Sequence, residues 1–163
     1  MLILSICVVV VLVDQYTKLL AQSQLRLAHS IEVIPGFFDL TYVQNTGAAF
    51  GIFSGMNLLL ALFSIVMLFG MVLMRRHFLT TSIYSHMFFG LVLGGIVGNM
   101  IDRLRWDYVI DFLDFYWQTH HFPAFNVADS AICIGVGIYM LMQVFSGPAA
   151  VQASSVSRDD TPA

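Results

Sequence analysis

The chain has 163 residues, of which 58% are hydrophobic and only 10% are charged. Soluble domains carry about 25% charged residues, so this composition excludes an ordinary water-soluble domain and indicates a membrane protein of one domain. The formal net charge of −3 comes without a run or stripe of basic residues, which excludes nucleic acid as an expected partner.

Four apolar segments have about the length of 20 residues that a helix needs to cross a bilayer. They cover residues 2–20, 57–74, 85–101 and 127–145. The first has the length of a signal-peptide core, but it lacks a basic start and a small-residue cleavage site, so we expect it to be retained. We therefore predict an all-α membrane protein with four transmembrane helices and both termini on one side.

Two short runs between the first and second spans have a different pattern. Apolar and polar residues partly alternate in residues 31–34 and 38–43, and the turn pair Pro35-Gly36 separates the two runs. This pattern is typical of short strands joined by a turn. We predict a small sheet at the membrane surface.

The stretch between the third and fourth spans, residues 102–125, contains eight aromatic residues. Aromatic side chains favour the headgroup zone of a bilayer, so we predict an interfacial loop or helix here. From residue 146 the chain is rich in Gly, Pro, Ala, Ser and Asp. We predict a disordered tail at 146–163, after a single domain at 1–145.

The basic residues do not decide the orientation by a simple count, because three lie on one side of the predicted spans and four on the other. Arg75 and Arg76 lie in a short loop where no polar motif accounts for them, and short cytoplasmic loops are enriched in such residues. We therefore predict cytoplasmic termini, with the polar motifs near the outer face of the inner membrane.

Ionisable side chains inside a membrane cost about 2.5–3.5 kcal/mol each on insertion scales, so each needs a physical explanation. Asp14 and Lys18 are spaced i, i+4 near the end of the first span and can form an ion pair. Such a pair either anchors the helix end or supports a bound substrate. Asn45 precedes Thr46 and Gly47, and it either shapes this turn or points its amide into a site.

The end of the third span carries a stripe of glycines and a polar face. Gly90, Gly94 and Gly98 are each four residues apart, which favours close packing against another helix. The polar face that follows consists of Asn99, Asp102 and Arg103. An Asp–Arg pair beside an asparagine is more typical of a structural brace than of a catalyst.

Two further acidic residues lie at notable positions, one among apolar residues and the other at the start of the fourth span. Asp111 lies between Ile110 and Phe112, where burial would raise the pKa of its carboxyl group unless the loop holds it in water. Asn126 is a good N-cap for the fourth span, and Asp129 falls at the third helical position. This capping role does not exclude a functional one.

Two carboxyl groups that share a proton could perform aspartic protease chemistry. The ionised group takes a proton from the attacking water, and the protonated group polarises the scissile carbonyl. Asp111 and Asp129 are 18 residues apart, and they would meet if the aromatic stretch folds back over the start of the fourth span. The residues alone leave five candidates, Asp102, Asp107, Asp111, Asp114 and Asp129.

Other chemistries find less support in the sequence. The histidines occur in no serine-nucleophile motif, and the adjacent pair His120-His121 does not have the spacing of a zinc motif, so we expect neither a metal nor a cofactor. A proton- or cation-coupled transporter would also explain buried aspartates, although no internal repeat is evident. A noncatalytic subunit, whose polar motifs only hold helices together, is a further alternative.

Five motifs in chain order resemble those of the bacterial lipoprotein signal peptidases, also called signal peptidase II. They are Asp14-Gln15-x-x-Lys18, Asn45-x-Gly47-Ala48-Ala49-Phe50, Gly94-Gly95-x-x-Gly98-Asn99-x-x-Asp102-Arg103, Val109-Ile110-Asp111-Phe112 and Phe125-Asn126-x-Ala128-Asp129. Each motif alone is weak, but five in this order on four predicted spans are specific.

The resemblance implies four transmembrane helices, a small periplasmic sheet and a periplasmic helix over the site. It also implies an inner-membrane aspartic endopeptidase without cofactors, which removes the signal peptide of prolipoproteins by cleaving before a diacylglyceryl-modified cysteine. The expected partners are these substrates and membrane lipids, and we expect a monomer. The resemblance selects Asp111 and Asp129 as the catalytic pair. The residues that it implies in substrate binding or bracing are Asp14, Lys18, Asn45, Gly47, Asn99, Asp102, Arg103 and Asn126.

Overall fold

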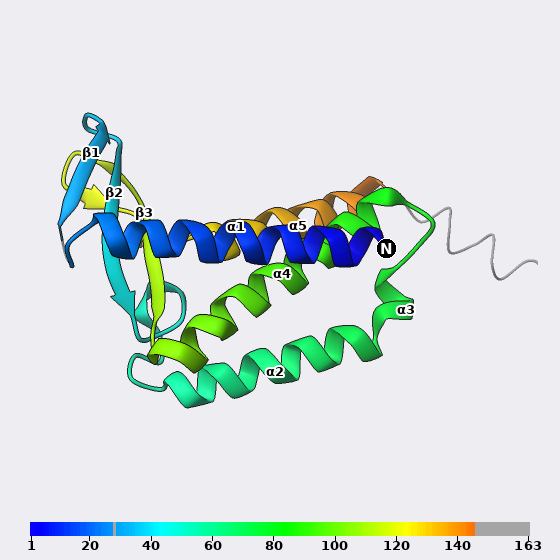
Figure 1. Ribbon diagram of the computed structural model, residues 1–163. Coiled ribbons are helices and arrows are strands. Elements are labelled where there is room, and N and C mark those ends of the chain that lie inside the picture. The colour runs from blue at the N-terminus through cyan, green and yellow to red at the C-terminus, as the bar shows by residue number, and fades with distance from the viewer. Residues whose placement is uncertain (28, 146–163) are drawn as a thin grey trace, which may run out of the picture.

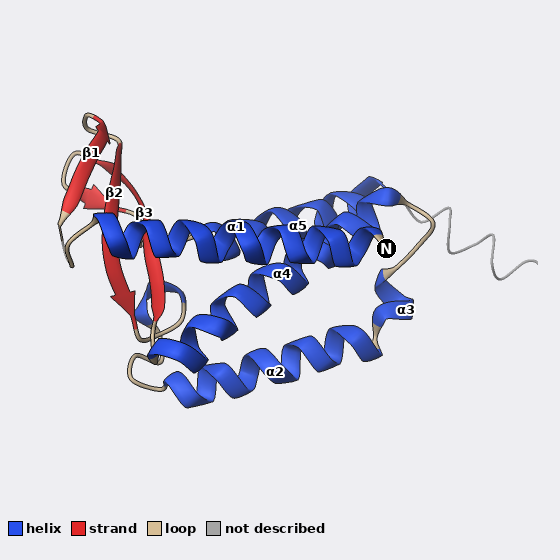
Figure 2. Ribbon diagram, viewed as in Figure 1, coloured by secondary structure: helices blue, strands red, loops and turns tan. Residues whose placement is uncertain are grey.

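Long apolar helices extend from a small sheet at one end of the molecule (Figures 1 and 2). The computed structural model describes residues 1–27 and 29–145, so the predicted tail at 146–163 lies outside the described residues. The long helices are α1 (Leu2–Gln24), α2 (Asn57–Leu73), α4 (Ile83–Trp106) and α5 (Val127–Phe145), and the single turn α3 (Arg75–Phe78) follows α2.

Three of the helices, α1, α4 and α5, are long and apolar enough to cross a membrane, whereas α2 has only 17 residues. The fourth predicted span has the bounds of α5, but the first and third predictions were too short. Helix α4 continues through Asp102 and Arg103 to Trp106, because hydrogen-bonding partners satisfy these polar side chains within the fold. The sequence prediction had ended the helix where the charges begin.

Helix α4 lies at the centre of the bundle because its glycines let two helices approach it closely. A Cβ atom on Gly90 would lie 2.8 Å from the Cβ atom of Ile6, and one on Gly94 would lie 2.7 Å from the Cβ atom of Val10. On another face of α4, a Cβ atom on Gly95 would collide with the carbonyl oxygen of Ala128 in α5. The predicted packing role of the glycine stripe is confirmed.

The sheet is antiparallel, with the strands in the order β1-β2-β3-β4. Strands β1 (Ser30–Ile34) and β2 (Phe38–Asn45) confirm the two predicted runs. Strands β3 (Val109–Trp117) and β4 (His120–His121) occupy the stretch that we predicted as an interfacial loop or helix, so the predicted secondary structure of this stretch was wrong. Its β-branched and aromatic residues favour a strand once a neighbouring strand is available.

The structure places no helix between residues 107 and 126, where the described chain forms strands and turns. The helical turn next to the site is instead η1 (Ala49–Gly51), which follows β2. Phe50 within it adopts a φ of 58°, a left-handed conformation that is uncommon for a bulky residue.

The sheet packs across the end of α1 and returns the chain to the start of α5. Ala21 of α1 joins Tyr42, Ile110 and Phe112 in a buried apolar cluster. Beyond β4, the backbone N–H of Phe125 donates to the carbonyl oxygen of Leu113 at 3.0 Å. This pairing brings the beginning of α5 beside β3, as the sequence argument required for the two aspartates to meet.

Candidate active site

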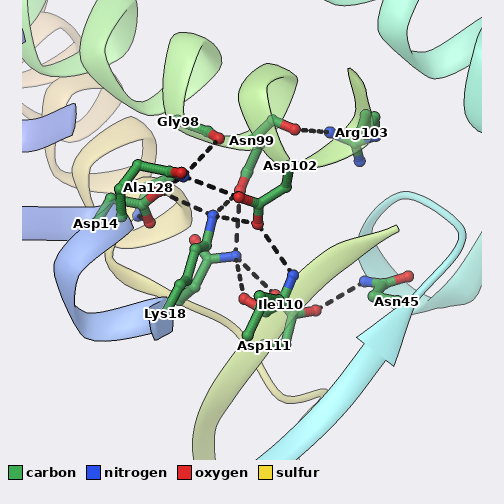
Figure 3. A network of polar contacts seen from close by, with 12 residues as sticks. Asp14, Lys18, Asn45, Gly98, Asn99, Asp102, Arg103, Ile110, Asp111 and Ala128 are labelled. Atoms are coloured by element: carbon green, nitrogen blue, oxygen red, sulfur yellow. Dashed lines mark hydrogen bonds and ion pairs between the residues drawn. The ribbon is translucent and has the colours of Figure 1, made fainter. Parts of the chain in front are cut away.

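The polar motifs converge where the sheet meets α1, α4 and α5 (Figure 3). Asp111 of β3 is 2% exposed, so nearly all of its contacts are with the protein. Asn45 Nδ2 donates to its Oδ2 atom at 2.9 Å, and Asn126 Nδ2 donates to its Oδ1 atom at 2.7 Å. Each carboxyl oxygen therefore accepts one amide hydrogen, which fixes the plane of the carboxyl group.

Asn126 links this carboxyl group to Asp129. The backbone N–H of Asp129 donates to Asn126 Oδ1 at 2.9 Å, and the backbone N–H of Asn126 donates to Asp129 Oδ2 at 3.3 Å. This reciprocal arrangement is a helix cap, so the predicted capping contact is confirmed. Because Asn126 Oδ1 is held by the cap, its Nδ2 is directed toward Asp111, and one residue orients both acids.

Asn99 of α4 connects Asp129 to a lysine. Its Nδ2 donates to Asp129 Oδ1 at 2.7 Å, and its Oδ1 accepts from Lys18 Nζ at 2.9 Å. A lysine ammonium group can only donate, so Lys18 determines which end of the Asn99 amide faces it. The opposite end then presents N–H to Asp129.

Lys18 lies in a buried cluster with two carboxylates. Its Nζ atom is 2.9 Å from Asp14 Oδ2 and 2.9 Å from Asp102 Oδ2. Backbone N–H groups complete the pairing, because Ala128 donates to Asp14 Oδ1 at 2.9 Å and Ile110 donates to Asp102 Oδ2 at 3.1 Å. These bonds tie α1 and α4 to the first residues of α5 and β3.

The turn before α2 forms another wall of the site. The backbone N–H of Gly47 donates to Asn45 Oδ1 at 2.9 Å, which directs the Asn45 amide nitrogen toward Asp111. Arg103 Nη2 donates to the carbonyl oxygen of Gly47 at 3.1 Å. A Cβ atom on Gly47 would lie 2.8 Å from the carbonyl oxygen of Ile52, so a larger residue would disturb this turn.

A cavity of about 480 Å³ has both Asp111 and Asp129 in its wall. Asn45, Asn99 and Arg103 also line it, whereas the rest of the lining is mostly apolar. The Phe50 ring from the turn after β2 meets the Phe122 ring edge-on at a centroid distance of 6.1 Å. The cavity therefore offers a few converging polar groups within apolar walls, as ligand sites commonly do.

Burial raises the pKa of Asp111 to about 7, and the negative charge of Asp129 adds to this effect. Hydrogen bonds from Asn45 and Asn126 act in the opposite direction. A carboxyl group with this pKa retains a proton at near-neutral pH, whereas an ordinary aspartate does not. Asp111 is thus suited to donate a proton or a hydrogen bond.

All ten residues that the sequence nominated lie in this network or at its edge. Two residues of the hydrogen-bond network, Gln15 and Asn57, were not among the predicted site residues. Gln15 Nε2 donates to Asp102 Oδ1 at 2.8 Å and to Asp14 Oδ2 at 3.2 Å, and a glutamine beside Asp14 in an apolar helix was a usable signal. Asn57 donates to the carbonyl oxygen of Arg103 at 3.0 Å, but its place at a helix start gave no such signal.

The three remaining candidate aspartates do not line the cavity, and one of them, Asp102, pairs with Lys18 instead. Asp107 ends α4 in a left-handed conformation and accepts from Asn57 at 3.2 Å. Asp114 pairs with His121 Nδ1 at 3.0 Å on the outer part of the sheet. Neither residue belongs to the cavity lining, so the geometry separates them from Asp111 and Asp129.

Comparisons with known proteins show which family the chain is similar to. Residues 6–145 match the family described as signal peptidase (SPase) II. The lipoprotein signal peptidase of Syntrophotalea carbinolica is 45% identical over 145 residues, covering 87% of this chain and 90% of that protein. The one from Geobacter metallireducens is 46% identical over 132 residues, covering 79% of this chain and 82% of that protein.

A solved structure is also similar. A bacterial membrane enzyme determined by the in meso method at 2.3 Å resolution superposes with a TM-score of 0.79 at 30% sequence identity. The match covers 99% of this chain and 93% of that one. The arrangement of the helices and the sheet is therefore that of a known membrane enzyme, and by its sequence the chain belongs to the signal peptidase II family.

Proposed function

We propose that Asp111 and Asp129 are the catalytic dyad of this peptidase. The chain is an aspartic peptidase of the lipoprotein signal peptidase type, which removes signal peptides from prolipoproteins. The observation that carries the dyad is that both carboxyl groups line one cavity and bond to the same residue, Asn126. A peptidase dyad accounts for the buried acids, so we do not propose the alternative functions of a transporter or a noncatalytic subunit.

The geometry suggests a division of roles within the dyad. Asp111, with its pKa raised to about 7, holds the proton and hydrogen-bonds to the oxygen of the scissile carbonyl. Asp129, which accepts hydrogen bonds from Asn99 and from the α5 backbone, is ionised and takes a proton from the attacking water. The water oxygen bonds to the carbonyl carbon, the C–N bond breaks, and the amine leaves with a proton from the dyad.

The substrate that this cavity favours is a prolipoprotein already carrying a diacylglyceryl group on the cysteine after the scissile bond. The relatives from Syntrophotalea and Geobacter are named lipoprotein signal peptidases. The mostly apolar lining suits a lipid-bearing residue, and the exposed apolar residues of α5 beyond the cavity wall, such as Ile134, offer a surface for acyl chains.

A test of this substrate compares one prolipoprotein with and without the diacylglyceryl group. The purified protein should cleave the modified form and release a product that begins with the lipidated cysteine, as mass spectrometry would show. The unmodified form should be cleaved at least about tenfold more slowly, because it lacks the apolar contacts of two acyl chains. Equal rates for the two forms would exclude recognition of the lipid.

The proposed membrane placement has four spans, with the termini in the cytoplasm and the sheet and dyad at the periplasmic face. At about 1.5 Å per residue, α2 is about 26 Å long, slightly less than the hydrocarbon thickness of about 30 Å. A membrane-impermeant thiol reagent tests this placement in a variant without Cys7 and Cys133. From the periplasm it should label a cysteine placed at Gly36 and not one placed at His77, and the reverse pattern would invert the topology.

A further inference from the structure

A second cavity, of about 700 Å³, lies at the end of the helix bundle that is far from the sheet. Its lining residues come from two parts of the chain, the segment from α3 to the start of α4 and the last turns of α5. Figure 1 shows these two segments at the same end of the bundle. None of its lining residues belongs to the dyad cavity. The proposed chemistry at the dyad therefore does not account for it.

The polar and apolar parts of this cavity are separated. The α3–α4 side contributes mainly polar groups, namely His77, Thr80, Ser82 and Tyr84. The α5 side contributes mainly apolar groups, namely Ile138, Leu141, Met142 and Phe145. Such a division fits an amphipathic ligand whose polar end meets the connection and whose hydrocarbon end lies along α5.

Two arginines directly precede the lining residue His77, although neither lines the cavity itself. They are Arg75 and Arg76 of the single turn α3, and both are exposed. Within residues 1–27 and 29–145, every acidic residue lies in the sheet-side half of the molecule, and no ion pair involves either arginine. This end therefore has two guanidinium groups without a carboxylate partner in the described part of the chain.

We propose that this cavity binds an anionic phospholipid. The phosphate lies against Arg75, Arg76 and the hydroxyl groups of the connection, and one acyl chain follows the apolar face of α5. Guanidinium groups bind phosphate oxygens in pairs of hydrogen bonds, and basic pockets between membrane helices commonly hold acidic lipid headgroups. Zwitterionic lipids lack the net charge that these two guanidinium groups would neutralise.

The alternative occupant of this cavity is the end of the chain itself. Residues 146–163 contain Asp159 and Asp160, whose negative charges would also be attracted to the two arginines. The experiment therefore uses the full chain. The protein is placed in phosphatidylcholine nanodiscs containing a small fraction of photoreactive phosphatidylglycerol, with the reactive group on an acyl chain. After illumination, mass spectrometry locates the labelled residues and measures the labelled fraction.

We expect saturable labelling within residues 138–145 that excess phosphatidylglycerol displaces and excess phosphatidylcholine does not. The double variant Arg75→Gln/Arg76→Gln should reduce the labelling about thirtyfold, since each cation near an anionic lipid contributes roughly a factor of five. Arg26→Gln removes an exposed positive charge near the sheet and should leave the labelling unchanged. Met142→Trp, which narrows the cavity at its apolar wall but keeps both arginines, should also reduce it.

Three results would overturn the proposal. Equal displacement by both lipids would show a general apolar groove. Labelling that Met142→Trp leaves unchanged would show attraction to charge on the surface and not a cavity. A chemical cross-link from residues 146–163 to the cavity, with no lipid labelling in the full chain, would show that the chain's own end fills it. Melting temperatures of all variants in phosphatidylcholine establish that each is folded.

Discussion

Asp111→Asn and Asp129→Asn should each reduce the rate of prolipoprotein cleavage by about 10²–10⁴-fold, the range that loss of a general acid or base costs. In the Asp111 variant, an amide nitrogen replaces one of two oxygens that now accept hydrogen bonds from Asn45 and Asn126. The new donor faces an existing donor, so the variant loses both the proton and the fixed orientation of the group.

Asp114→Asn is the matched control for this experiment. It makes the same chemical change in the same strand, three residues beyond Asp111, but it alters a side chain that pairs with His121 outside the cavity. We expect a rate close to that of the unchanged protein. Activity should be measured as single-turnover cleavage of the lipid-modified substrate, with the melting temperature as the test of folding. A dyad variant that is folded and still cleaves at a near-normal rate would remove its residue from the mechanism.

Lys18→Met should have the largest effect on stability. The substitution leaves Asp14 and Asp102 buried without their shared cation, and Lys18 itself is 1% exposed. Removing one partner of a buried ion pair costs about 3–5 kcal/mol, so the free energy of unfolding in detergent should fall by about that amount. Cleavage should also fall, because Asn99 Oδ1 loses its charged donor and keeps only the 3.2 Å hydrogen bond from Asn126 Nδ2, which weakens the orientation that serves Asp129.

Two comparisons make the Lys18 prediction specific. Gln24→Met introduces the same apolar side chain at the exposed end of α1 and should change stability by less than about 0.5 kcal/mol. The double variant Lys18→Met/Asp102→Asn removes one of the two unpaired charges, so it should be more stable than Lys18→Met alone. Equal stability of the single and double variants would show that Asp102 does not depend on Lys18.

The sequence predicted the parts of the fold that follow from short-range patterns. Hydropathy located the helices, and the spacing of Gly90, Gly94 and Gly98 correctly predicted a packing face on α4. Asn126 and Asp129 were predicted as a helix cap, and they form one. These features depend on residues within a few turns of one another, so their geometry is encoded locally.

The features that the sequence did not predict depend on contacts between distant segments. Strand β3 forms because β2 is available to pair with it, whereas its aromatic residues alone also fit an interfacial loop. The choice of Asp111 and Asp129 among five acids likewise needed the return of the chain at Phe125, which no local pattern reveals. Only the family resemblance selected this pair from the sequence.

The buried Lys18 cluster is directly connected to the pair Asp111 and Asp129. The cluster of Lys18, Asp14 and Asp102 joins α1 and α4 to the first residues of α5 and β3. The dyad sits on the next residues of these same two elements. Because Lys18 pairs with both carboxylates and backbone N–H groups donate to them, the cluster can position the proposed dyad without leaving a buried charge unpartnered.

The pH dependence of kcat/KM tests the central claim that Asp111 and Asp129 share one proton. Burial and the charge of Asp129 raise the pKa of Asp111 to about 7, so the protonated form that catalysis requires is lost as the pH rises through this value. We predict a bell-shaped profile whose alkaline side falls near pH 7, with Asp114→Asn giving the same profile. A rate that continues to rise well above pH 7 would contradict the dyad mechanism.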